Sequence, residues 1–137
     1  MKVTKARLVK LGACNEAIVK YFSDKKSWEA KELLAAAIKN KDWSMARWGI
    51  SRLMTHKQQI RWAIYCAEQV IKVYEDKYSG DDSPRKATNA AKKYLKKPSK
   101  ESKADAYTAA YIAAAAAASK TINTKLLKKG LQILEAK

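Results

Sequence analysis

The sequence contains few of the residues that interrupt helices, and it has little support for β structure. Glycine occurs four times and proline twice in 137 residues. Alanine and lysine are abundant, and no segment shows the alternation of β-branched residues that is typical of strands. Because alanine and lysine also have high helix propensity, these features together favour an all-α protein.

Cysteine is scarce as well, which argues against a disulfide framework and against a metal site. The two cysteines, Cys14 and Cys66, lie far apart in the chain, and neither belongs to a pattern with metal-ligand spacing. We interpret both as buried thiols in a reducing cytoplasm.

Long apolar runs are also missing. Lys5, Arg7 and Lys10 interrupt the N-terminal segment, so we expect no signal-peptide core there. The alanine-rich stretch from Ala109 to Ala118 is short and only weakly apolar, so it is a poor candidate for a membrane span. We therefore expect a cytoplasmic protein that does not enter a membrane.

Acidic residues are few relative to basic ones. The chain has 29 Lys and Arg against 13 Asp and Glu, a formal net charge of +16. Such an excess repels itself and attracts polyanions, namely nucleic acid, an acidic protein surface or an anionic membrane. The competing interpretation is a solvated surface without a partner. The charge is divided evenly, with about +8 on each half of the chain, so no separate basic tail explains it.

Apolar residues recur at helical spacing along nearly the whole chain. At this length we predict one domain covering residues 1–137, a compact bundle of about seven or eight helices. The predicted helical segments are 4–22 (one helix, or two with the break at Gly12), 27–39, 43–54, 56–78, 84–97, a long helix from Ser99 or Ser102 to 118, and 121–137.

The segment from His56 to Tyr78 is predicted to be the central helix. It has apolar residues on more than one side, which is typical of a helix enclosed by others. Thr55 is a suitable N-cap, and Ser79-Gly80 a suitable stop. Among the other predicted helices, we expect Asp42 to cap the helix that follows it, and Gly49 to allow a neighbour to approach closely.

The helix predicted from Pro84 to Lys97 is strongly amphipathic. Ser83 as N-cap and Pro84 as first helical residue mark its start. Ala87, Ala91 and Tyr94 fall on its apolar side. The basic residues on its other side, and just beyond its end, are the candidate binding residues: Arg85, Lys86, Lys92, Lys93, Lys96, Lys97, Lys100 and Lys103.

Two interpretations of this basic face are equally well supported by the sequence. Lysines at helical spacing can neutralise successive phosphates, which produces salt-dependent affinity with little sequence preference. Alternatively, they keep an alanine-rich helix soluble. Between Arg85 and Lys103 only one acidic residue, Glu101, interrupts eight basic ones.

No set of residues predicts catalysis, a cofactor or a metal. His56 is the only histidine and lies at a predicted helix start, and neither Cys14 nor Cys66 has an evident partner for nucleophilic chemistry. Asp81 and Asp82 are better explained by the preference of helix N-termini for negative charge. We therefore predict a non-enzyme without cofactors.

The four tryptophans admit two interpretations. Core packing is the simpler one. The alternative is that one or two of them lie at a rim and anchor a protein partner, since tryptophan is enriched in interface hot spots.

Several segments resemble the Imm5-like immunity proteins, small helical proteins associated with bacterial toxin systems and related mobile or phage elements. The residues that carry the resemblance are Ala13, Cys14, Glu16, Ala17, Phe22, Asp42, Trp43, Met45, Trp48, Arg61, Ala63, Cys66, Ala67, Glu68, Val70, Tyr74, Glu75, Gly80, Asp81, Asp82, Pro84–Ala87 and Asn89–Ala91. The block from Asp82 to Ala91 is the most specific part.

The resemblance implies a non-catalytic protein that inhibits an effector by binding it. An inhibitor that mimics nucleic acid should be acidic, whereas this chain is basic, so direct mimicry is not expected. The chain could instead hold an acidic surface of a nucleic-acid-acting effector, a toxin or a defence nuclease, or bind the DNA or RNA that the effector carries. A phage-encoded inhibitor such as an anti-CRISPR protein would fit either route. The alternative is a general nucleic-acid-binding protein without a protein target.

Overall fold

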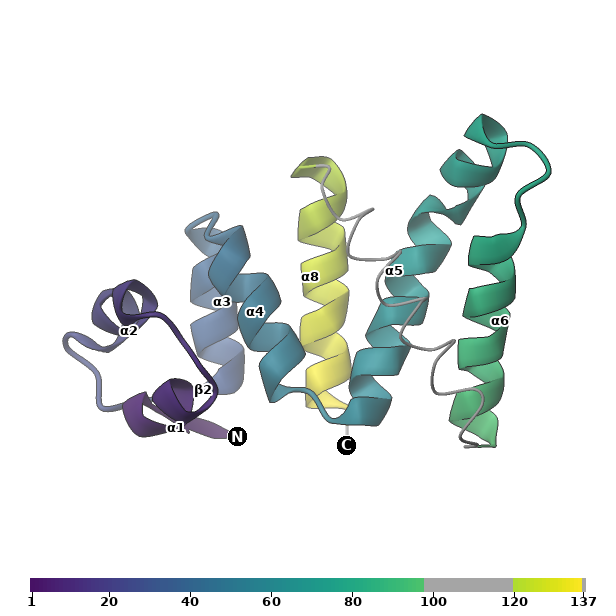
Figure 1. Cartoon of the computed structure of the whole chain (residues 1–137). Helices are drawn as coiled ribbons and strands as arrows, with labels where there is room; N and C mark the ends of the chain where they lie inside the picture. The colour runs from purple at the N-terminus through teal and green to yellow at the C-terminus, as the bar shows by residue number, and fades with distance from the viewer. Residues whose placement is uncertain (98–119, 137) are drawn as a thin grey trace. The chain divides into compact units, whose positions relative to one another are not determined.

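The structure is a computed structural model that describes residues 1–97 and 120–136 (Figure 1). Within these residues the chain forms seven helices and one two-stranded sheet, so the predicted all-α class is confirmed apart from the small sheet. The chain groups into two compact units: unit 1 comprises Met1–Leu53 with Leu134–Lys137, and unit 2 comprises Met54–Ile133. That the chain folds as a single domain stays a prediction.

Two short helices lie near the start of unit 1. Helix α1 covers Lys5–Lys10 and helix α2 covers Asn15–Phe22. Gly12 separates them with φ of +84°, a left-handed conformation in which glycine avoids the strain of a Cβ atom. The Thr4 side chain caps α1 by accepting from the amide of Arg7 at 3.2 Å. The predicted break at Gly12 is confirmed.

The sheet pairs two segments that are far apart in the sequence. Strand β1 (Lys2–Thr4) runs antiparallel to β2 (Ser27–Glu29), with Val3 opposite Trp28. The predicted helix start at the first residue of β2 is therefore wrong, and helix α3 covers Ala30–Lys39. A strand of three residues is too short to show alternation, and its hydrogen-bond partners are non-local, so local sequence signals cannot reveal it.

Asp42 connects helix α2 to the start of helix α4 (Trp43–Leu53). Its Oδ1 accepts from the amide of Met45 at 3.1 Å, which confirms the predicted cap. Its Oδ2 accepts from Lys20 Nζ at 2.8 Å and from the Tyr21 hydroxyl at 3.0 Å. One side chain therefore both begins α4 and holds α2 against it.

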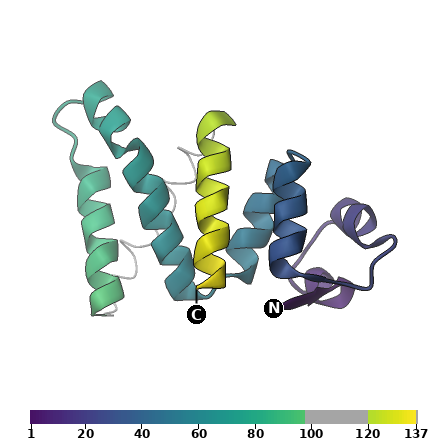
Figure 2. The same cartoon turned by 180° about the vertical axis from the view of Figure 1, so that it is seen from behind.

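Helices α3 and α4 form an antiparallel pair, which both Figure 1 and the reverse view in Figure 2 show. Gly49 lies buried where they meet. A Cβ atom added there would lie 2.5 Å from Cδ2 of Leu34, a fully buried side chain with little room to move. The expected close approach at Gly49 is confirmed.

Unit 2 begins with helix α5, which covers His56–Lys77. Thr55 and Gln58 form a reciprocal capping box: the threonine hydroxyl accepts from the Gln58 amide, and the Gln58 side chain accepts from the Thr55 amide. Gly80 has φ of +96° in the turn that follows. Both predicted ends of this helix are thus close to those observed.

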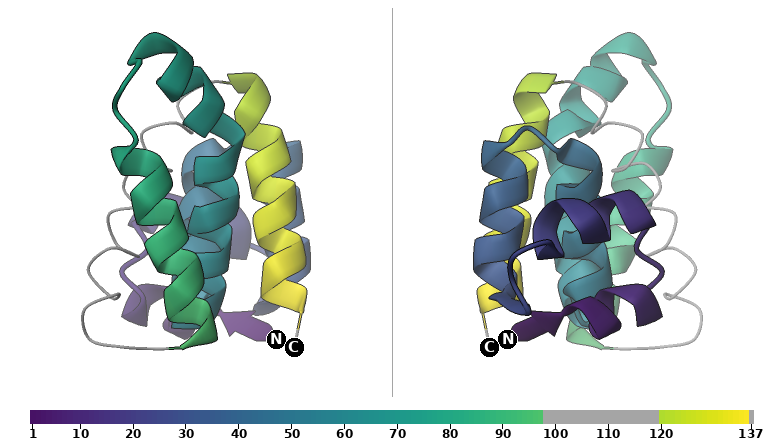
Figure 3. Two further views of the ribbon diagram at one scale, coloured as in Figure 1. Left: turned by 90° about the vertical axis from the view of Figure 1, so that its right-hand side faces the viewer. Right: turned by 90° about the vertical axis from the view of Figure 1, so that its left-hand side faces the viewer.

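Helix α5 lies between α6 (Ser83–Lys96) and α8 (Lys120–Glu135), as Figure 1 and the left view of Figure 3 show. Ile60 and Ile64 pack towards α6, whereas Cys66 and Ala67 pack with Leu126 of α8. The Trp62 indole N–H also donates to the Leu126 carbonyl at 3.0 Å. Two flanking helices explain why α5 is apolar on more than one side.

The start of α6 differs by one residue from the prediction. Asp82, not Ser83, is the N-cap residue, and Ser83 is already helical. The Ser83 amide donates to Asp81 Oδ1 at 3.0 Å. The loop aspartate therefore satisfies one of the backbone donors that a helix N-terminus leaves without an intrahelical partner.

Helix α8 begins within one residue of its predicted start and continues through Gly130. Its Leu126 and Leu127 are fully buried. The predicted helix 99–118, with its alanine-rich seam, lies outside the described residues, as do Lys100 and Lys103.

Candidate binding surface on the α5–α6 hairpin

The described candidate basic residues lie on α6 or, for Lys97, at its C-cap, and α6 packs antiparallel to α5. The apolar side of α6 is in the predicted place: Ala91 is fully buried with Ile60 and Ile64. The rings of His56 and Tyr94 meet edge to face with centroids 5.9 Å apart. The first turn of α5 therefore lies beside the last turn of α6.

Arg85, the first candidate residue, is occupied by an internal ion pair. Its Nε and one terminal nitrogen donate to the two carboxylate oxygens of Glu75, each at 2.6 Å. This bidentate pair lowers the pKa of Glu75 and raises the pKa of Arg85. Arg85 thus ties α6 to α5.

Two further candidates have acidic partners. Lys92 pairs with Glu68 of α5 at 2.6 Å. Lys86 pairs with Asp82, one helical turn before it, at 3.0 Å. Their charges are partly compensated within the protein, and exposed pairs of this kind contribute little to stability.

Lys93, Lys96 and Lys97 differ from the other described candidates. All three are exposed, and none makes an ion pair with any residue in the described ranges. The structure therefore separates the six described candidates into a paired group, Arg85, Lys86 and Lys92, and an unpaired group, Lys93, Lys96 and Lys97.

Two residues that were not among the sequence candidates lie at the same end of the hairpin. Lys57 and Arg61 are one turn apart in the first turns of α5, and both are exposed. Because the start of α5 lies beside the end of α6, they share one end of the hairpin with Lys93, Lys96 and Lys97. We call these five residues the basic end.

Sequence patterns within α6 could not include Lys57 and Arg61, because more than thirty residues separate them from Lys93. The available signal was their i, i+4 spacing after a predicted cap. The acidic residues of the hairpin that take part in ion pairs, Glu68, Glu75 and Asp82, all pair with cations nearer the start of α6.

The two loop aspartates have structural roles, in agreement with the sequence interpretation. Asp81 accepts from the Tyr74 hydroxyl at 2.7 Å and from the Ser83 amide at 3.0 Å. The pKa of Asp81 is lowered mainly by a hydrogen bond from the Ser83 side chain, and also by the bonds from Tyr74 and the Ser83 amide. Asp82 occupies the N-cap position of α6 without a side-chain capping bond, and it pairs with Lys86.

The cysteines differ from each other. Cys66 is buried, as expected, and burial raises the pKa of its thiol to about 12. Cys14 is exposed, so the prediction of a buried thiol there is wrong. It occupies the N-cap position of α2, in an extended backbone conformation and without a side-chain capping bond. Among the described residues, no group of three or more His, Cys, Asp and Glu side chains could hold a metal ion.

A family model described as "Imm-5 like putative immunity protein" matches residues 50–129. The chain belongs to this family. The resemblance expected from the sequence is confirmed for its strongest block, whereas the residues quoted before position 50 lie outside the match. Comparison with curated proteins and with solved structures gives no match.

The Imm5-like segment contains all of α5 and α6, and therefore the whole basic end. In the part of the chain that the structure describes, no helix combines the length and the apolar character that crossing a bilayer requires.

Proposed function

We propose that this protein is a non-catalytic, immunity-type inhibitor that binds and neutralises an effector acting on nucleic acid. The observation that carries the proposal is the position of the basic end inside the Imm5-like segment. An immunity protein works through a partner effector, and an unpaired basic surface within the family segment is suited to an anionic contact.

The anionic contact is best supplied by the phosphates of DNA or RNA held by the effector. Lys93, Lys96 and Lys97 are exposed at helical spacing, and Lys57 and Arg61 extend the same surface from α5. Each cation that meets a phosphate releases condensed counterions, which makes affinity strongly dependent on salt. An acidic patch on the effector protein is the other partner that this charge could meet.

A purely structural role for these lysines makes a different prediction. Lys93 and Lys96 lie in the last turn of α6, where cations compensate the partial negative charge of the helix end. If that were their whole purpose, replacing them would lower stability and leave binding unchanged.

The test is a salt series of fluorescence-anisotropy titrations with short DNA and RNA, from about 50 to 200 mM salt. If each of the five residues of the basic end meets one phosphate, log K should fall against log salt with a slope of about −4.5, which weakens binding roughly 500-fold over this range. The variant Lys93→Glu, Lys96→Glu, Lys97→Glu should weaken binding and reduce the slope of log K against log salt by about three, one for each lost contact. Lys92 is kept, because it pairs with Glu68.

The matched control reverses the same number of lysine charges in unit 1, outside the basic end. Lys5, Lys10 and Lys39 are exposed residues of unit 1, and their replacement by Glu should have a much smaller effect on the slope. Equal loss in both variants would show only a general charge effect, and no binding at low salt would exclude nucleic acid. Pull-down with the wild-type chain then separates an inhibitor, which retains an effector, from a general nucleic-acid-binding protein, which does not.

A further inference from the structure

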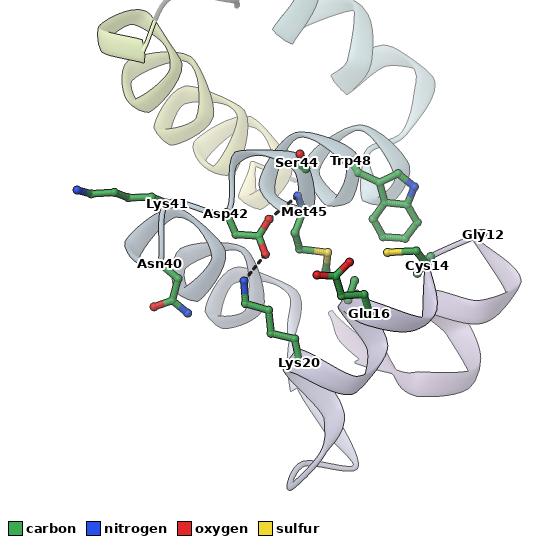
Figure 4. Close-up of a pocket in the computed structure, with 12 residues that line it drawn as sticks. Gly12, Cys14, Glu16, Lys20, Asn40, Lys41, Asp42, Ser44, Met45 and Trp48 are labelled. Carbon is green, nitrogen blue, oxygen red and sulfur yellow. Dashed lines mark hydrogen bonds and ion pairs between the residues drawn. The ribbon is translucent and has the colours of Figure 1, made fainter.

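Unit 1 contains a pocket of about 550 Å³, separate from the basic end. Its lining comes from the turn between α1 and α2, from α2 itself, from the turn before α4, and from α4 (Figure 4). A volume of this size lies in the range of small-ligand sites and exceeds what one side chain needs. The pocket could therefore accept a short segment of a partner chain.

The apolar side of the pocket is formed by α4. Met45 is almost fully buried and Trp48 is half-buried. The indole N–H groups of Trp28 and Trp62 each donate to a backbone carbonyl, at 2.6 and 3.0 Å. The indole N–H of Trp48 has no acceptor among the described residues. Trp48 is thus less committed to internal hydrogen bonding than these two tryptophans.

On the charged side of the pocket, one carboxylate, that of Glu16, lies near a cation without forming an ion pair with it. Lys20 is positioned one turn after Glu16, a spacing that favours an ion pair, but its ammonium group is held by Asp42 at 2.8 Å. Glu16 is exposed and makes no ion pair or hydrogen bond within the described part of the chain. Glu16 lines the same pocket as Cys14, Met45 and Trp48, and Figure 4 draws its side chain between those of Lys20 and Cys14 in that view.

We propose that this pocket binds an arginine side chain presented by a protein partner. The guanidinium group would meet the Glu16 carboxylate, and its planar face would stack on the Trp48 ring. A pocket lined by a carboxylate, a half-buried indole and a thioether is suited to a cation with an apolar stem. Arginine fits better than lysine, because its planar fork can both pair bidentately with a carboxylate and stack on an aromatic ring.

An anionic ligand is disfavoured by the same geometry. The Lys20 charge is compensated by Asp42, and Lys41, the other cation of the lining, extends away from the centre of the pocket in Figure 4. A purely apolar ligand would take Glu16 out of water without a partner, which costs free energy. The inference does not rest on the basic end: an effector that acts on nucleic acid offers arginines, but so do other proteins.

The chain carries its own reporter for the test. Cys14 lines the pocket and is exposed, whereas Cys66 is buried and its pKa is raised to about 12. An alkylating reagent that requires thiolate therefore modifies Cys14 first in the folded protein. An occupant of the pocket should slow this modification.

The experiment measures the Cys14 alkylation rate in the native protein with end-blocked tripeptides at millimolar concentration. The central residue is arginine, its neutral analogue citrulline, or glutamate. The arginine peptide should protect Cys14, and the other two should not. Isothermal titration calorimetry with the same peptides gives the affinity directly.

Glu16→Gln should weaken arginine-peptide binding by about tenfold or more, the usual effect of removing a charged hydrogen-bond partner. Glu32→Gln is the matched control: Glu32 is an exposed carboxylate of α3 in the same unit, outside the pocket lining. Far-UV circular dichroism checks that both variants are folded.

No protection by the arginine peptide would overturn the inference. Equal protection by the citrulline or glutamate peptide, or equal loss of binding in the two variants, would also overturn it. The nucleic-acid titrations do not depend on this outcome, because they probe residues of unit 2.

Discussion

Asp42 shows how a single side chain organises unit 1. The sequence predicted only its capping role, because capping is a local signal read over three residues. The structure adds Lys20 and Tyr21 of α2, both of which donate to the oxygen that does not cap. The hydrogen bond from Lys20 is the main reason why the pKa of Asp42 lies below its usual value.

This lowered pKa leads to a prediction about acid stability. A carboxyl group with a lower pKa in the folded chain stabilises the fold above its unfolded pKa, and the stabilisation is lost as pH falls through the folded pKa. We therefore expect Asp42→Asn to unfold at lower urea concentration than wild type at neutral pH. The difference should shrink as pH falls below about 4. Urea unfolding across this range measures it, and a constant difference would contradict the role assigned to the Asp42 charge.

At the scale of elements, helix ends were easier to predict from sequence than helix neighbours. The caps at Thr55 and Asp42 and the break at Gly12 depend on residues within one turn, and all three are observed. The sequence predicts the first turn of α3 where strand β2 lies, because the partner of this strand is more than twenty residues away. A helix cap depends on residues within one turn of it, so the local sequence predicts it. Strand pairing depends on a partner segment far away in the sequence, so the local sequence does not.

The capping box of α5 gives a prediction at this scale. Thr55→Ala removes the hydroxyl that accepts from the Gln58 amide, so the free energy of unfolding should fall by about 1 kcal/mol. Cys14→Ala is the matched control, because Cys14 is the N-cap of α2 but makes no side-chain capping bond. Chemical denaturation of both variants should show a clear loss only for Thr55→Ala. Similar losses would mean that the cap bond is not what Thr55 contributes.

At the scale of the whole molecule, the cooperativity of unfolding distinguishes one domain from two. The sequence predicts one domain, and the described residues group into two compact units. A single domain of this size should unfold in one transition that all probes follow.

Cys66 can report this transition, because it is buried in unit 2. In a Cys14→Ser variant, which removes the exposed thiol, labelling of Cys66 should coincide with the loss of far-UV circular dichroism as urea rises. If part of the circular dichroism signal is lost at urea concentrations too low to make Cys66 reactive, the two units unfold separately.

Helix content, most helix ends, the basic charge and the Imm5-like segment can all be read from the chain, since composition, periodicity and capping act over a few neighbouring residues. Only the tertiary structure determines which basic side chains form ion pairs and which do not. It paired Arg85 and Lys92 with acids of α5 and left Lys93, Lys96 and Lys97 unpaired beside Lys57 and Arg61. It also placed Glu16 and Trp48 around one pocket. Such groupings depend on contacts between distant segments, which arise only when helices pack.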